Sequence, residues 1–564
     1  MTSAGGGGSI PPIEIGSFVA PQPDKSEFIG SASGVFFVHT VFRAFAAVSS
    51  DVSASPTGAQ RPPQGGVSEV VADPGSAHDF LVASENTHDE VGEPTRRATG
   101  ATRRGTSTTG QTGRDYGITT PGLGRAPELQ TANRLIMTYF RHWHPLFPFL
   151  HGPSFFEQIS HFYEEPSRSS QTALTSTAYP TEHAKSCRAV IFQCVFNLAA
   201  SCSGGNRDTL PSYCRIESNF ALMSLMGVIC ITPAIVSLQA LLAMELYLIS
   251  HSALRAASTI HGALTRMLYH LGLHRCPYRY VQLPRDVCNL RQRIFWCAYV
   301  LDRYLSQALG HPTSINDEEI DACIPAMKEL HQPVRPRGQT SSSEAEATAE
   351  EEVRAHLPKT PTTANSQRVP QRNSERADDR QPASTTPTLL SAQSPAHHHR
   401  SKPDEAGEYV LAYLVTYSRL VGRALDLFHV SIPNRDISWD KILSLTCEIR
   451  SWWNTLPSAL QHDDGGSSAQ NEASQYGTLF AILYSSLILF INRPFLSLPT
   501  HRTDFRSSLQ DALTASRSVI SVIRQVGQDQ PLVWPGTLSA LWMSGLVVSF
   551  ASLLEHYPFE KAKT

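Results

Sequence analysis

The first 186 residues of the chain contain no cysteine. The ten cysteines stand between Cys187 and Cys447, and the closest two, Cys187 and Cys194, are seven positions apart (194 − 187 = 7). Structural zinc sites usually take their ligands from close pairs such as C-x2-C. We therefore expect no metal ligands, and free thiols packed as small apolar groups. The N-terminus shows no signal peptide, which favours a reducing compartment over a disulfide framework.

The chain also lacks an excess of positive charge. Lysine and arginine total 47 against 50 acidic residues, a formal net charge of −3 over 564 residues. Nucleic-acid binding would therefore need a local basic patch. The one sparse cluster comprises Arg96, Arg97, Arg103, Arg104 and Arg114. It is typical of a solvated tail, with nuclear import or contact to a DNA backbone as the alternative.

Motifs of catalysis are missing as well. The sequence contains no P-loop, G-x-S-x-G, H-E-x-x-H or dinucleotide fingerprint. Prolines separate His142, His144 and His151, and the run 397–399 of histidines lies in a low-complexity stretch. We expect no catalytic residue and no bound cofactor, and hence no enzyme.

Two apolar runs, 232–250 and 477–496, approach the length of a membrane span. The first carries Gln239 and Glu245, and the second ends at Asn492-Arg493-Pro494. These polar residues favour core helices, so we expect a soluble protein without a membrane partner.

Composition divides the chain into four parts. Residues 1–126 are rich in Gly, Ser, Thr and Pro and are predicted to be mostly disordered, because such segments bury too little apolar surface. An apolar island at 27–48 is expected to dock on the folded body. Residues 127–330 form a first helical block, 331–405 a disordered insertion, and 406–564 a second helical block of the same domain.

The periodicity of apolar residues predicts an all-α fold around one large core, and no convincing alternating strand appears. An amphipathic pattern at Leu135, Ile136, Tyr139 and Phe140 precedes a break at His144-Pro145. Further helices are expected at about 185–203, 211–227, 232–250, 252–273, 286–309, 316–323, 406–430, 436–455, 474–492, 506–527 and 535–555.

The stretch RQRIFWCAYVLDRYLSQALGHPTSINDEEIDACIP, residues 291–325, gathers acids, a histidine and two cysteines. Its apolar residues recur every three or four positions, Gly310 and Pro312 form a helix stop, and Asn316 with Glu319 has capping-box spacing. Asp302 and Arg303 are neighbours that do not face each other on a helix. We therefore expect each to form a buried ion pair with a different helix rather than with the other.

These motifs resemble the fungal-specific transcription factor domain of Zn2Cys6 activators, also called the middle homology or xylanolytic activator regulatory domain. Five stretches carry the resemblance, over about 27–555. They are MTYFRHWHPLFPFLHGPSFF, the stretch 291–325, FINRPFL, IRSWWNTLPSAL and EFIGSASGVFFVHTVF. The signature residues, expected to hold the domain together, are Arg293, Phe295, Trp296, Asp302, Arg303, Gly310, Pro312 and Pro325, with Tyr299 in packing.

The resemblance implies a nuclear regulator of RNA polymerase II genes. Its implied partners are DNA, co-regulators, a second copy of the chain and a small-molecule effector. The family carries two zinc ions in an N-terminal cluster of six cysteines, which has no counterpart in residues 1–186. The cluster is therefore expected upstream of Met1 or lost, and the alternative function is a metabolite-binding or partner-binding helical protein without DNA contact.

Overall fold

The computed structural model describes twelve stretches of the chain. They are residues 16–19, 27–42, 114–116, 122–164, 182–202, 210–280, 282–327, 403–435, 437–461, 473–526, 534 and 536–558. Two compact units divide the chain, one of residues 1–332 with 403–564 and one of residues 333–402. Most of the predicted tail and nearly all of the predicted insertion lie outside the described residues.

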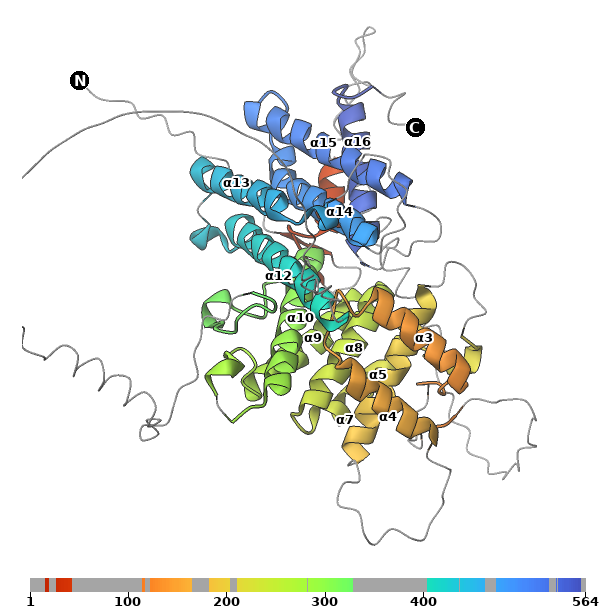
Figure 1. Cartoon of the computed structure of the whole chain (residues 1–564). Helices are drawn as coiled ribbons and strands as arrows, with labels where there is room; N and C mark the ends of the chain where they lie inside the picture. The colour runs from red at the N-terminus through yellow and green to blue at the C-terminus, as the bar shows by residue number, and fades with distance from the viewer. Residues whose placement is uncertain are drawn as a thin grey trace, which may run out of the picture. The chain divides into compact units, whose positions relative to one another are not determined.

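Helices dominate the described residues, and the predicted all-α class is confirmed (Figure 1). The first block contains α3 (Leu129–His142), α4 (Gly152–Glu164), α5 (Glu182–Ser201), α6 (Asn219–Met223), α7 (Met226–Cys230), α8 (Ile235–Ser250), α9 (Leu254–His270) and α10 (Arg285–Leu309). Short 3-10 turns lie at η2 (Ser212–Cys214), η3 (Pro277–Arg279) and η4 (Asp317–Glu319).

The second block begins with α12 (Pro403–Phe428), which contacts both α10 and α13 (Trp439–Thr455) and lies between them in Figure 1. It continues with α14 (Ala473–Asn492), α15 (Thr503–Gln525) and α16 (Gly536–Leu553). The 3-10 turns of this block are η5 (Ile432–Asn434), η6 (Ser458–Leu460) and η7 (Arg493–Ser497).

The predicted continuous helix at 211–227 is broken into η2, α6 and the start of α7. The amide of Arg125 donates to the carbonyl of Tyr213, and the amide of Glu217 donates to Gly122. These bonds hold the backbone outside a helix, and the Ser218 side chain then caps α6 by accepting from the amide of Ala221. The predicted helix at 316–323 shrinks to η4, while α4 had no counterpart among the expected helices.

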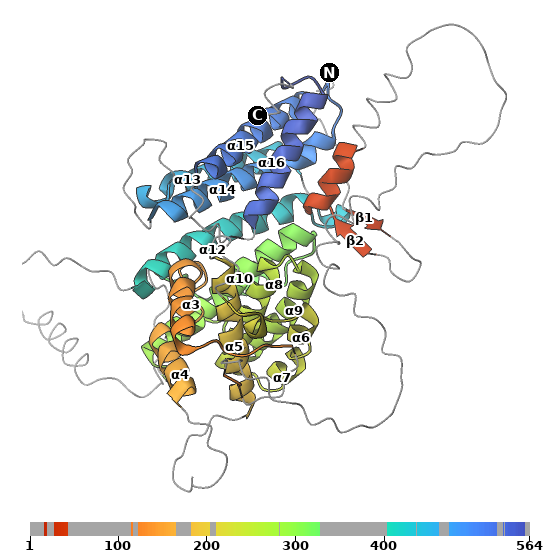
Figure 2. The same cartoon turned by 90° about the vertical axis from the view of Figure 1, so that its right-hand side faces the viewer.

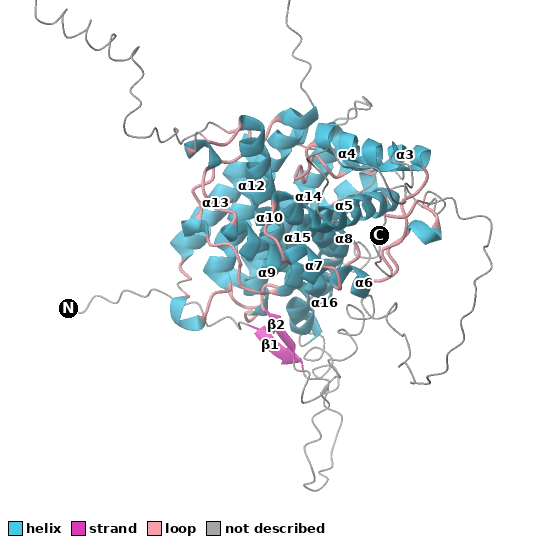
Figure 3. Ribbon diagram, turned by 90° about the horizontal axis from the view of Figure 1, so that it is seen from below, coloured by secondary structure: helices cyan, strands magenta, loops and turns pink. Residues whose placement is uncertain are grey.

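A two-stranded antiparallel ribbon forms the strand content of the described residues (Figure 3). Strand β1 (Gly16–Val19) pairs with β2 (Glu27–Gly30), so that Gly16 lies opposite Gly30. A turn and a helix at 34–42 follow directly. Ser33 starts that helix, because its hydroxyl accepts from the amide of Phe36 at 3.2 Å.

One hydrophobic core joins both helical blocks. It takes side chains from α3, α5, α8, α9 and α10 of the first block and from α12 to α16 of the second. Two of its helices have long stretches in which every residue is buried, from Ala189 to Ala199 in α5 and from Ala240 to Ile249 in α8. Since a helix that is apolar on all sides belongs in a core, their sequences fix the centre of the first block.

Two helical segments, Tyr476–Ser497 and Gly536–Leu553, are long and apolar enough to cross a membrane by length and composition. The apolar window of the first is 78% buried inside the domain, as the sequence predicted for a core helix. The window of the second is 44% buried, and Leu538 and Trp542 on α16 are exposed.

The substitution Leu241→Ala in α8 should lower the free energy of unfolding by about 2–5 kcal/mol, because Leu241 is fully buried and its loss leaves a cavity. The matched change Leu538→Ala on the exposed side of α16 should stay within about 0.5 kcal/mol. Urea unfolding followed by circular dichroism measures both. Equal effects of the two substitutions would contradict this assignment of the core.

Candidate functional site

Helix α10 carries most of the signature residues, and its ends follow from local sequence. It starts directly after Pro284, whose extended backbone precedes the first turn. It ends at Gly310, which adopts a left-handed conformation with φ of 71° and donates its amide to the carbonyl of Ser306 at 2.9 Å. Glycine reaches this conformation without strain, which makes it the common residue at a helix end.

The apolar side of α10 packs through aromatic rings. Phe295, Trp296 and Tyr299 are fully buried, and the Trp296 ring lies 5.1 Å from that of Tyr299. The indole Nε1 of Trp296 donates to the carbonyl of Cys323 at 2.7 Å, which ties the segment after η4 to α10. Two further signature residues, Arg293 and Pro325, are buried, whereas Pro312 is exposed and its carbonyl accepts from Ser306 at 3.4 Å.

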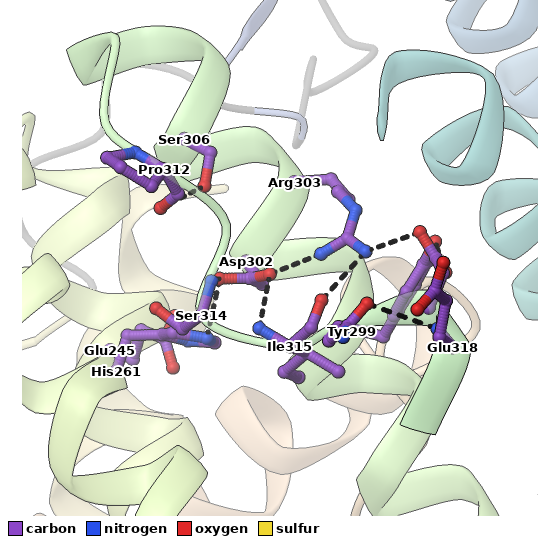
Figure 4. A network of polar contacts seen from close by, with 12 residues as sticks. Glu245, His261, Tyr299, Asp302, Arg303, Ser306, Pro312, Ser314, Ile315 and Glu318 are labelled. Carbon is purple, nitrogen blue, oxygen red and sulfur yellow. Dashed lines mark hydrogen bonds and ion pairs between the residues drawn. The ribbon is translucent and has the colours of Figure 1, made fainter. Parts of the chain in front are cut away.

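Asp302 and Arg303 form an ion pair with each other, which corrects the expectation that they do not (Figure 4). The Arg303 side chain is long enough to turn back along the helix, so that Nη1 reaches Oδ2 of its neighbour. Both residues are 1% exposed. The expected partners on other elements are present as well, so each residue has two charged neighbours.

The other neighbour of Asp302 is His261 of α9, whose Nε2 lies 3.2 Å from Oδ1. On its opposite side, Nδ1 of His261 contacts Oε1 of Glu245 on α8 at 2.8 Å. His261 therefore lies between two carboxylates from two other helices.

The other neighbour of Arg303 is Asp317 of η4, with Nη2 and Oδ2 2.8 Å apart. Arg303 also donates to the carbonyl of Ile315 at 2.9 Å, and its guanidinium lies 4.2 Å from the centre of the Tyr299 ring. Tyr299 donates its hydroxyl to Asp317 at 2.7 Å.

Asp302 accepts hydrogen bonds from the amides of Ser314 and Ile315 at 2.9 and 3.2 Å. Two charged residues of α10, Asp302 and Arg303, therefore hold the whole 314–317 turn.

We call Glu245, His261, Asp302, Arg303 and Asp317 the charge relay, because acid and base alternate along it. Burial alone would lower the pKa of His261, but Glu245 and Asp302 outweigh burial and raise it to about 10. Burial alone would raise the pKa of Asp302, but contacts with His261, Arg303 and the Ser314 amide bring it below its usual value. Burial raises the pKa of Glu245, which the contact with His261 opposes.

The charge relay is suited to holding helices together rather than to chemistry. Glu245, His261 and Asp302 are 0%, 2% and 1% exposed, so no substrate reaches them. Removing one member of such a buried set leaves an uncompensated charge, which is strongly destabilising. The relay is thus a structural centre that joins α8, α9, α10 and η4.

Asp302 and Arg303 were predicted from the sequence to form buried ion pairs, whereas Glu245 and His261 were not. A signal was present, because Glu245 interrupts an otherwise apolar helix. A carboxylate buried there requires a cationic or hydrogen-bonding partner. Sequence alone did not identify that partner, since His261 lies 16 positions away on another helix.

The residues present do not fit the family's zinc cluster. Among the described residues, no group of three or more His, Cys, Asp or Glu side chains could hold a metal ion. All ten cysteines are free thiols. The sulfur atoms of Cys276 and Cys323 lie 3.8 Å apart, and this pair would supply two ligands where a structural zinc ion takes four.

The fold is all-α, and its polar centre is buried among the helices. The model of the family described as "Fungal specific transcription factor domain" matches residues 136–454, more than half of the chain. The chain belongs to this family, as the motifs of residues 137–156 and 291–325 indicated. Two similar proteins are named as a probable transcription factor and as a transcriptional activator protein.

Three relatives illustrate the range of similarity. A probable transcription factor of Fusarium proliferatum is 36% identical over 98% of this chain and 72% of its own length. Transcriptional activator protein acu-15 of Neurospora crassa is 20% identical over 72% of this chain and 35% of its own length. An uncharacterized transcriptional regulatory protein of Schizosaccharomyces pombe is 33% identical over 17% of this chain and 15% of its own length.

Asp302→Asn should lower the free energy of unfolding by about 3–5 kcal/mol, because it removes the buried charge between His261 and Arg303. The same change at Asp317, whose side chain is 46% exposed, should cost about 1 kcal/mol or less. Chemical unfolding of both variants tests the ranking. A smaller loss for Asp302→Asn than for Asp317→Asn would show that the relay does not stabilise the domain.

The raised pKa of His261 predicts a pH dependence of stability. Its contribution is full below the ordinary value of 6.5 and is lost as pH rises through about 10. Between pH 7 and 8.5 the free energy of unfolding should therefore fall as pH rises, with a slope close to that expected when unfolding releases one proton. His261→Gln should remove most of that slope. An unchanged slope in this variant would contradict the assignment of a protonated His261.

Proposed function

We propose that this protein is a nuclear regulator of RNA polymerase II genes, and that its helical domain is the regulatory part. The observation that carries the proposal is the similarity to a probable transcription factor along 98% of the chain. The family match to residues 136–454 supports the same reading, since it covers the helices around the charge relay.

The helical domain acts through contacts with other proteins or effectors rather than through its own zinc cluster. The first cysteine is Cys187, inside α5, where it is buried. Close cysteine pairs are missing from the whole sequence, and the net charge is −3. Without a zinc module or a strong basic patch, contact of this chain with DNA is weak and governed by salt.

A reporter assay tests the regulatory role. The full chain, fused to an unrelated DNA-binding module, should change expression of a reporter gene that carries the matching site. Loss of this effect in a folded, nuclear fusion would count against a regulatory domain. An exclusively cytosolic native protein whose deletion alters no transcripts would overturn the proposal as a whole.

The purified full chain should bind duplex DNA with a Kd weaker than about 1 µM at physiological salt, and binding should weaken steeply as salt rises. Fluorescence anisotropy with labelled duplexes at several salt concentrations measures this. Tight and sequence-selective binding at physiological salt would show that the chain reads DNA directly.

A further inference from the structure

Residues 27–42, which we call the clamp, contact both helical blocks. Figure 2 shows the clamp helix, in red, beside α16. Ile29, Ala32, Phe37, Val38 and Val41 are at most 7% exposed. Ala32, Phe37 and Val41 belong to the main hydrophobic core. A segment of 16 residues thus contributes to the packing of a domain whose next described residue is Arg114.

On the first block, the clamp meets the end of α10. Gly30 lies against Gly310 so closely that a Cβ on Gly30 would overlap the Gly310 carbonyl. A Cβ on Gly310 would equally overlap the backbone of Gly30. Two backbones in direct contact leave no side chain that could move aside, so both positions require glycine.

On the second block, the clamp is held by polar contacts at its turn. The hydroxyl of Ser31 lies 2.7 Å from Nδ1 of His429, just after α12. Nη2 of Arg493 in η7 donates to the carbonyl of Ala32 at 2.6 Å. The Arg493 guanidinium also lies 5.3 Å from the centre of the Phe490 ring, and the His429 ring stacks on the same Phe490 at 5.3 Å.

The clamp helix then packs on α16. The rings of Phe37 and Phe550 meet edge to face with centres 6.5 Å apart. A Cβ on Gly34 would lie 3.0 Å from Cε of Met543, the flexible end of a side chain. This contact can adjust, whereas the contact of Gly30 with Gly310 cannot.

We propose that Gly310, His429, Arg493, Met543 and Phe550 form a peptide-docking surface, and that residues 27–42 occupy it as an exchangeable clamp joining the two helical blocks. Its occupant is this chain's own segment. The surface recognises three features of that segment: Gly30, which lies against the backbone of Gly310, the Ser-Ala-Ser turn, and the apolar helix that follows. If the proposed regulatory function holds, occupancy of this surface couples the N-terminal tail to the regulatory domain.

The long connection in sequence between the clamp and the body is consistent with a clamp that binds the body as a separate segment. Residues 43–113, a stretch of 71 residues (113 − 43 + 1 = 71), connect it to Arg114. Two polar contacts join the turn of the clamp to His429 and Arg493, both of which lie more than 390 positions away along the chain. No neighbour in sequence is therefore needed to complete these contacts.

The test uses the full chain with a protease recognition sequence inserted between Gly65 and Gly66. A tether favours the chain's own segment over a free peptide, so cleavage must precede competition. After cleavage, the N-terminal fragment should co-elute with the body in gel filtration at micromolar concentration. A free peptide of residues 27–42 should displace the labelled fragment.

Peptide variants provide controls that leave the fold of the body unchanged. The Gly34→Ala peptide should compete about as well as the natural one, because Met543 can move. The Gly30→Ala peptide should compete more weakly by about tenfold or more, since its methyl group overlaps a backbone carbonyl. Dissociation of the cleaved natural fragment at micromolar concentration, or equal competition by both variants, would overturn the proposal. Because the assay involves no transcription, its failure is distinguishable from failure of the proposed function.

Discussion

The domain depends on one set of charged side chains at its centre, in which each charge has an opposite charge beside it. The charge relay is this set, and each of its members contacts the next in the order Glu245, His261, Asp302, Arg303 and Asp317. The set begins inside α8, which is buried on all sides, and ends at η4, where Asp317 reaches solvent. A charge removed from the interior of such a series leaves two neighbours uncompensated, so its members act as a unit.

Helix α10 connects the charge relay to the rest of the domain through its packing contacts. Arg303 packs so tightly on α12 that a Cβ on Gly422 would lie 2.9 Å from its Nε. Arg419 of the same helix lies 5.1 Å from the centre of the Trp296 ring. At the end of α10, Gly310 receives the clamp. The same helix therefore positions the turn at 314–317, the first helix of the second block and the N-terminal segment.

Sequence patterns predicted the parts of this arrangement that depend on local chemistry. Apolar periodicity gave most helices, and a glycine in the left-handed conformation ends α10 as expected. Contacts between distant segments were not predictable in the same way. The break at 211–217 comes from backbone bonds to residues 122–125. The Asp302–Arg303 pair forms because the Arg303 side chain turns back to its neighbour while also reaching Ile315 and Asp317. The packing of residues 27–42 on the body could be expected from the apolar character of the island at 27–48, of which 43–48 lie outside the described residues, but the partners His429 and Arg493 could not.

Hydrogen exchange at the amides of Ser314 and Ile315 tests the central role of the charge relay most directly. Both lie in a turn without helical hydrogen bonds, and both donate to Asp302. If the relay holds the turn on α10, these two amides should exchange about as slowly as amides in the centre of α10. Exchange at the rate of an open loop would contradict the account.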